Sequence, residues 1–222
     1  MKVLVDRNIE RNAVTHKTVN VEKTSKWGRQ KTTSLIASRL ARPPRLDEQF
    51  RIEQLPYLAS ICIFAKTGKL EFFTSQEIRM EGYRQKSGGK GYLGINLLDG
   101  VPIKCVPCPI DRPLTISAGG SIGVTEDEQM EFFRSIANPR FVTIAKAVGA
   151  NRIDDAYHLW TAEEAHLDAF LTMDKKFRDA TAKHHVLINS LVQVMTPRDL
   201  AECLSLQPAD IEAIARSINP FS

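Results

Sequence analysis

Residues 154–174 read DDAYHLWTAEEAHLDAFLTMD, a helical pattern that passes into a short apolar strand and ends on an aspartate. The helix is predicted over AYHLWTAEEAH and the strand over DAFLTM. A strand that directly follows a helix is typical of the α/β class, in which helices cover both faces of a parallel sheet. Several carboxylates in so apolar a stretch raise the question whether they bind a metal ion.

The rest of the chain repeats this alternation of strand and helix. Thr74 with Glu77 three residues later fits a capping box, which predicts the start of a helix there. The other predicted strands are KVLV (2–5), KLEFF (69–73), a short strand near 101–106 and LVQVM (191–195). Two further helices are predicted over 55–65 and 126–136, and two more are predicted to begin at Asn138 and at Thr196. We therefore expect a three-layer α/β/α sandwich with a central parallel sheet, formed by a single domain over residues 1–222.

The amino-acid composition limits the classes of protein to which the chain can belong. The chain has 222 residues with 43% hydrophobic and 25% charged, which is ordinary for a globular domain with its own core. The longest apolar run, about 57–65, is far shorter than a membrane span, and MKVLVDRN turns polar at Asp6, unlike a signal peptide. Four scattered cysteines do not make a disulfide framework, and the Cys105–Cys108 pair lacks the second pair of a structural zinc site. A cytoplasmic protein with reduced thiols and no membrane contact is expected.

Charge is distributed unevenly along the chain. Residues 11–45 contain nine Lys or Arg and one acid, Glu22, so this segment carries 9 − 1 = +8 and the remainder 4 − 8 = −4. A basic segment on an acidic body predicts a contact with a polyanion such as RNA, although a solvated surface arm would also explain it. Lys26, Trp27, Arg29 and Lys31 place an aromatic ring among cations, a combination that binds single strands by stacking and charge. Trp27 packed against the body is the alternative.

Two segments interrupt the α/β pattern. The basic insertion covers about 11–50, and within it TVNV (18–21) alternates while TSLIASRLA (33–41) is amphipathic up to Pro43-Pro44. The second segment, about 83–125, is rich in Gly and Pro and predicts loops around one short strand. Its KSGGKGYLG stretch (86–94) lacks the spacing of a phosphate-binding loop.

Four acids from separate segments are expected to converge. Asp6 and Asp174 follow predicted strands, where ligands of parallel sheets bind, while Asp155 opens a helix and Glu81 lies one turn beyond Glu77. Two bare charges 4 Å apart repel by about 4 kcal/mol at an effective dielectric near 20. Mg²⁺ or Mn²⁺ would relieve this repulsion, and such ions support hydrolysis at phosphorus.

The sequence resembles the PIN-domain nucleases in three stretches, VLVDRN (3–8), TSQEIRMEG (74–82) and DDAYHLWTAEEAHLDAFLTMDKKF (154–177). The resemblance covers the core of the chain but not residues 11–50 or 83–125. It implies a PIN-like sandwich in which the catalytic and metal-binding acids are Asp6, Glu81, Asp155 and Asp174, helped by Asn8 and Thr172. Glu77 and Asp154 are the rivals of Glu81 and Asp155, and His158 shares a helix face with Asp155. Each acid alone is more often structural. The structural alternatives are a turn cap for Asp6, a solvated charge for Glu81, a helix N-cap for Asp155 and the start of a turn for Asp174.

These observations predict a divalent-metal-dependent ribonuclease. The alternatives are a PIN-like module that binds nucleic acid without hydrolysis, or the toxin of a toxin-antitoxin pair held by an antitoxin-like partner. The resemblance also implies that two copies can pair as a homodimer.

Overall fold

A five-stranded parallel sheet forms the centre of the molecule. The computed structural model describes residues 1–27, 30–41, 49–84, 94–112, 125–184 and 190–218. The sheet has the order β6-β4-β1-β7-β8, and all four strand pairings are parallel. Its strands are β1 (Lys2–Val5), β4 (Glu71–Ser75), β6 (Ile103–Val106), β7 (Ala169–Leu171) and β8 (Gln193–Met195).

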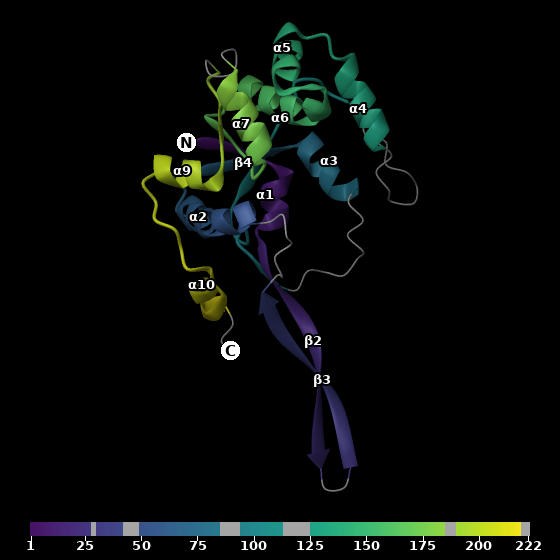
Figure 1. Cartoon of the computed structure of the whole chain (residues 1–222), viewed down its shortest axis with the longest axis vertical. Coiled ribbons are helices and arrows are strands. Elements are labelled where there is room, and N and C mark those ends of the chain that lie inside the picture. Colours follow the sequence, from purple (N-terminus) through teal and green to yellow (C-terminus); the bar gives the residue numbers. More distant parts are fainter. Residues whose placement is uncertain (28–29, 42–48, 85–93, 113–124, 185–189, 219–222) are drawn as a thin grey trace.

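Helices cover both faces of this sheet, which confirms the predicted three-layer α/β/α sandwich (Figure 1). Side chains alternate across a strand, so Val3 and Val5 of β1 enter one core and Leu4 enters the other. The first core is closed by α1 (Arg7–Asn12), α2 (Gln49–Lys66), α9 (Pro197–Cys203) and α10 (Ile211–Ile218). The second is closed by α3 (Gln76–Arg84), α4 (Glu126–Ser135), α5 (Pro139–Val148), α6 (Ile153–Glu164) and α7 (Lys175–Lys183), with the short 3-10 helix η1 (Ala150–Arg152) before α6.

Capping chemistry defines several helix starts as predicted. Asn138 accepts hydrogen bonds from the backbone of residues 140 and 141, and Pro139 occupies the first position of α5. Thr196 and Asp199 form a capping box at the start of α9. The helix predicted over 55–65 is α2, which begins earlier, at Gln49, and contains Pro56.

The predicted capping box of Thr74 and Glu77 is wrong. β4 continues through Ser75 because Thr74 and Ser75 still pair with β6, and the Ser75 hydroxyl accepts the hydrogen bond of the Ile78 backbone N–H at 3.3 Å. Thr74 is buried, and its hydroxyl has no hydrogen-bond partner within the described ranges. The strand predicted over 69–73 is therefore shifted by two residues, to 71–75.

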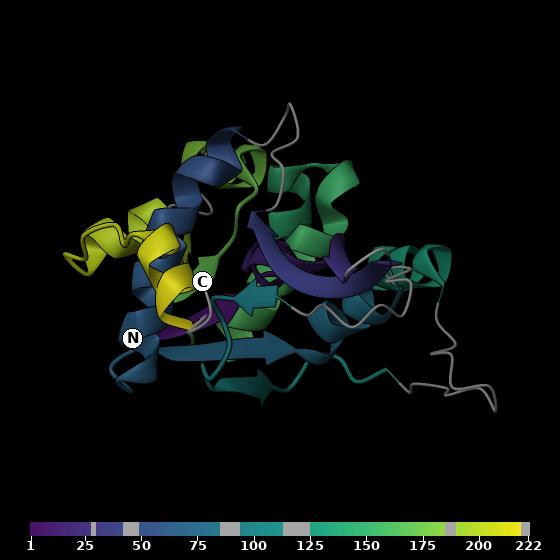
Figure 2. The same ribbon diagram turned by 90° about the horizontal axis from the view of Figure 1, so that it is seen from below.

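The basic insertion contains a long β-hairpin. Its strands β2 (Val14–Trp27) and β3 (Gln30–Ala41) pair antiparallel over twelve residue pairs, and the amphipathic stretch 33–41 belongs to β3. β5 (Gly94–Asn96), a strand that the sequence did not predict, pairs with the base of β2. The hairpin projects from the body in Figure 1, and Figure 2 views the molecule from the end to which it points.

Candidate active site

The carboxyl ends of β1 and β7 bring two polar segments together. These strands are neighbours in the sheet, and the ladder continues one residue beyond β1, where the Asp6 backbone N–H donates to the Leu171 carbonyl at 3.0 Å. Asp6 follows β1 and Thr172 follows β7. Ligands of parallel sheets bind at this edge. The strand topology therefore creates the juxtaposition that the sequence could only suggest.

Hydrogen bonds hold the Asp6 carboxylate in a fixed orientation. Asp6 is buried, and its Oδ2 accepts from the Thr172 hydroxyl at 2.6 Å and from the Asn8 amide at 2.5 Å. Asn8 also donates to Thr172 at 2.9 Å and accepts from the Met173 backbone N–H at 2.9 Å. Although Asp6 precedes α1, its side chain makes no capping bond to that helix. Its orientation is thus set by the site and not by helix capping.

Asp174 is tied to the same network through its backbone. Its N–H donates to the Thr172 hydroxyl at 3.0 Å. Its side chain caps α7, where Oδ1 accepts from the Phe177 backbone N–H at 2.9 Å. Asp174 thus caps a helix, where the sequence suggests only that it could begin a turn. The cap uses only one of the two carboxylate oxygens, Oδ1, and does not involve Oδ2.

Asp154 and Asp155 lie in the first turn of α6. Burial raises the pKa of Asp155 to about 8, and the charges of Asp154, Asp6 and Asp174 contribute to that increase. Burial also raises the pKa of Asp6 to about 6, although the hydrogen bond from Thr172 opposes the increase. The neighbouring negative charges thus disfavour ionisation of Asp155, which is the condition that a bound cation relieves.

Glu81 reaches the site from α3 and meets His158 of α6. The Glu81 Oε1 lies 2.7 Å from His158 Nε2, and His158 is only 2% exposed. Burial lowers the pKa of His158, but Glu81, Asp6 and Asp154 outweigh that effect and raise it to about 9. His158 Nδ1 is buried and has no hydrogen-bond partner among the residues that the structure describes. The pair joins two helices at the rim of the acidic site.

Glu77 belongs to a different cluster. Its buried carboxylate accepts from Arg112 Nη2 at 2.8 and 3.0 Å and from the Gln129 amide at 2.5 Å. Arg112 also lies over the ring of Phe132, 5.0 Å from its centroid. Sequence reasoning did not find Arg112 and Gln129, because they lie 35 and 52 residues from Glu77 and no local pattern joins them.

The donor set suits a hard cation such as Mg²⁺ or Mn²⁺. Asp6, Asp155, Asp174 and Glu81 offer carboxylate oxygens only, which these ions prefer. Within the described ranges, no group of three or more His, Cys, Asp or Glu is already arranged to hold a metal ion. Mg²⁺ commonly binds through one or two protein carboxylates and keeps several waters. Asp6 and Asp155 are therefore the pair that would hold the ion, with Asp174 and Glu81 beside them.

The basic residues predicted to bind RNA lie on the hairpin. Lys26 and Lys31 are exposed and stand directly opposite each other near its end. Arg29 and the side chain of Trp27 lie outside the described residues, so the choice between stacking and packing for Trp27 stays a prediction.

All four cysteines are free thiols, with Cys105 exposed and Cys108 half-buried.

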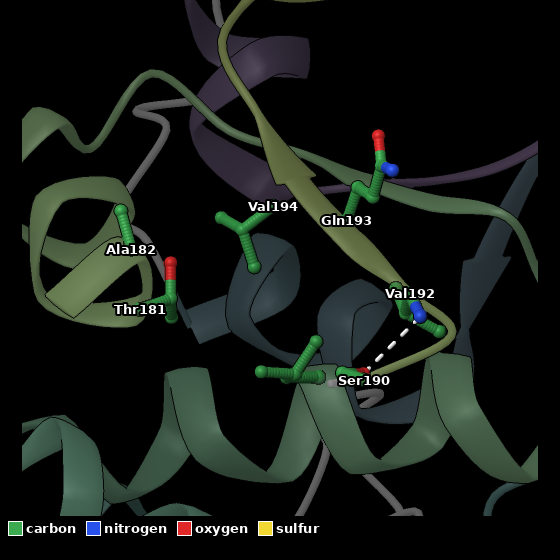
Figure 3. A pocket seen from close by; sticks show the side chains of 7 residues that line it. Thr181, Ala182, Ser190, Val192, Gln193 and Val194 are labelled. Carbon is green, nitrogen blue, oxygen red and sulfur yellow. Dashed lines mark hydrogen bonds between the residues drawn. The ribbon is translucent and has the colours of Figure 1, made fainter. Parts of the chain in front are cut away.

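A small cavity elsewhere contains none of these acids. It has a volume of about 160 Å³ and lies between α6, the end of α7 and the start of β8 (Figure 3). Thr181, Val192 and Val194 are among the residues that line it. It offers hydroxyl and amide groups but no charged side chain, so it does not compete with the acidic edge as a candidate active site.

The fold and the acidic edge define an α/β/α protein with a carboxylate site at the carboxyl ends of its central strands. No protein-family model, curated protein or solved structure matches the chain. None of the described helices is long and apolar enough to cross a membrane.

Proposed function

We propose that this protein is a divalent-metal-dependent ribonuclease of the PIN-like kind, with its site at Asp6, Glu81, Asp155 and Asp174. The observation that carries the proposal is the buried Asp6 carboxylate, which Thr172 and Asn8 hold at the ends of β1 and β7 and whose charge acts on Asp155 of α6. Burial raises the pKa of both carboxyl groups. Perturbed carboxylates at this edge of a parallel sheet are typical of functional sites. The resemblance of 3–8, 74–82 and 154–177 to PIN-domain nucleases supports the same assignment.

The protein's own residues would orient the reacting groups. Thr172 and Asn8 fix the Asp6 carboxylate, and His158 holds Glu81. A bound Mg²⁺ or Mn²⁺ would supply the chemistry, by activating water and stabilising displacement at phosphorus. Asp6 and Asp155 would bind that ion. Glu81 and Asp155 lie on helices, and Asp6 and Asp174 closely follow strands, which hold such groups more precisely than long loops do.

A nucleic-acid-binding module without hydrolysis is the second candidate. It is favoured by the hydrogen bond that already joins Glu81 to His158. Incubation of purified protein with single-stranded RNA and Mn²⁺ separates the two. Cleavage that requires the metal supports the nuclease, and binding without cleavage supports the module. The toxin role would require an antitoxin-like partner, which a small DNA-binding protein encoded beside this one would indicate.

His158→Gln is expected to weaken Mn²⁺ binding about 10- to 100-fold, the usual effect of removing a residue that orients a metal ligand. Glutamine carries no positive charge and lacks the rigid imidazole ring, so Glu81 loses the charged partner that fixes it at 2.7 Å. Calorimetric titration with Mn²⁺ measures the effect. His184→Gln, a change at an exposed histidine that ends α7, is the matched control and should bind like the wild type. Equal affinities in the wild type and His158→Gln would show that His158 is only a packed side chain.

A further inference from the structure

Over the residues that the structure describes, the hairpin is a long ribbon that a third strand supports only at its base. Its pairs run from His16–Ala41 to Trp27–Gln30, a length of about 36 Å at roughly 3.3 Å per residue. β5 pairs with β2 up to Lys17, and among the described residues no third strand pairs with the hairpin beyond that point. Figure 1 shows the ribbon extending away from the helices.

Contacts at the base fix where the ribbon leaves the body. His16 is buried, and its Nδ1 lies 2.9 Å from the Thr15 hydroxyl. Its Nε2 lies 3.5 Å from Glu212 of α10. The Leu97 backbone N–H donates to the Ala13 carbonyl at 2.9 Å. The hairpin is therefore attached to the domain at a defined point, next to α1.

The ribbon's charge is unfavourable for a hairpin that stands alone. Its two strands contain five basic residues and one acid, Glu22, and Lys26 stands directly opposite Lys31. Like charges directly opposite in a sheet are destabilising, and a two-stranded hairpin is marginal in water. A polyanion along the ribbon would remove the repulsion and give the strands a partner. The five basic residues of the two strands are Lys17, Lys23, Lys26, Lys31 and Arg39.

The base of the ribbon lies close to the acidic site along the chain. Asp6 and Ala13 flank α1, a helix of six residues and therefore about 9 Å long. A nucleic-acid strand that occupies the site can thus continue onto the ribbon. Successive phosphates of a stacked strand are about 3.4 Å apart, so the ribbon spans about ten nucleotides.

We propose that the β2–β3 hairpin binds single-stranded RNA beyond the cleavage site and makes the protein selective for long strands over short ones. The inference rests on the proposed function, because it assumes that the same RNA strand begins at the site of Asp6 and Asp155 and continues along the hairpin. The positive charge of the hairpin is complementary to the negative charge of the RNA phosphates, which makes RNA the expected ligand. A strand of about five nucleotides that occupies the site cannot cover the ribbon, and one of about 25 nucleotides covers its whole length.

The test is RNA binding measured by fluorescence anisotropy in EDTA, where hydrolysis does not contribute. The wild type should bind a 25-nucleotide single strand at least about tenfold more tightly than a 5-nucleotide strand. Lys26→Glu with Lys31→Glu should abolish that preference and flatten the log–log salt slope by roughly 1.4, about 0.7 for each lost phosphate contact. Lys66→Glu with Lys69→Glu changes the charge equally at exposed positions of the body and should leave both quantities unchanged.

Unchanged affinity and salt slope in the Lys26/Lys31 variant would overturn the inference. It would also be overturned if that variant altered the sedimentation mass but not RNA binding, since the ribbon would then join two copies. Hydrolysis of a small phosphodiester in Mn²⁺ tests the proposed function separately. If the wild type hydrolyses nothing and the length preference still depends on Lys26 and Lys31, the nuclease proposal fails while the ribbon's binding role stands.

Discussion

Asp6→Asn and Asp155→Asn are each expected to lower the rate of Mn²⁺-dependent RNA cleavage by at least about 10²- to 10³-fold, the effect of removing one preorganised electrostatic group from an active site. Asparagine keeps the shape of the side chain but cannot supply the negative charge that a divalent cation requires. Burial raises the pKa of both carboxyl groups, so each negative charge stands where water solvates it poorly and where a cation would be its main partner. Cleavage of a labelled single-stranded RNA measures the rates.

Asp127→Asn is the matched control, because Asp127 also lies in the first turn of a helix, α4, but is exposed and remote in sequence from the site. It should cleave at the wild-type rate. Circular dichroism should show that all three variants keep their fold, since asparagine carries no charge to bury. Full activity in a double variant, Asp6→Asn with Asp174→Asn, would refute the assigned site.

Arg112→Met is expected to lower the free energy of unfolding by about 3–5 kcal/mol, as removal of one partner from a buried ion pair usually does. Glu77 is 2% exposed and the Arg112 side chain 12% exposed, so the change leaves a buried carboxylate without its cation. The Gln129 amide still donates to Glu77 but brings no charge. Urea unfolding followed by circular dichroism measures the loss.

The exposed pair of Lys104 and Glu71 provides the comparison. Its side chains are 59% and 42% exposed at a separation of 2.9 Å, and surface pairs contribute about 0–1 kcal/mol. Lys104→Met should therefore change stability by no more than about 1 kcal/mol. If Arg112→Met is no more destabilising than Lys104→Met, the Glu77 cluster does not anchor α3, and the position of Glu81 must be set by other contacts.

Much of the core could be predicted from the sequence, because the features that define it are local. The apolar run KVLV indicates a buried strand, and the capping residues Asn138 and Thr196 mark where helices begin. Parallel order follows from the alternation of strand and helix. That order places Asp6 and Thr172 at one edge of the sheet, where they are joined by a 2.6 Å hydrogen bond.

Features that depend on pairing over long distances were not predicted. The amphipathic stretch 33–41 carries no local sign that it pairs with β2, and β5 is a strand only because the hairpin base lies beside it. The Thr74 capping pattern fits the local rule, yet pairing with β6 extends the strand to Ser75 and moves the cap there. The partners of Glu77 come from another part of the chain. The hydrogen bond of Glu81 to His158 likewise joins two helices, although the shared helix face of Asp155 and His158 indicated the region.

The most direct test of the central claim is an anomalous-difference map from a crystal of the wild-type protein soaked in Mn²⁺. The proposed site predicts one peak in direct contact with carboxylate oxygens of Asp6 and Asp155, at the carboxyl ends of β1 and β7, and loss of that peak in Asp155→Asn. A Mn²⁺ peak elsewhere, or a map with no ion between these two carboxylates at a saturating concentration, would contradict the claim.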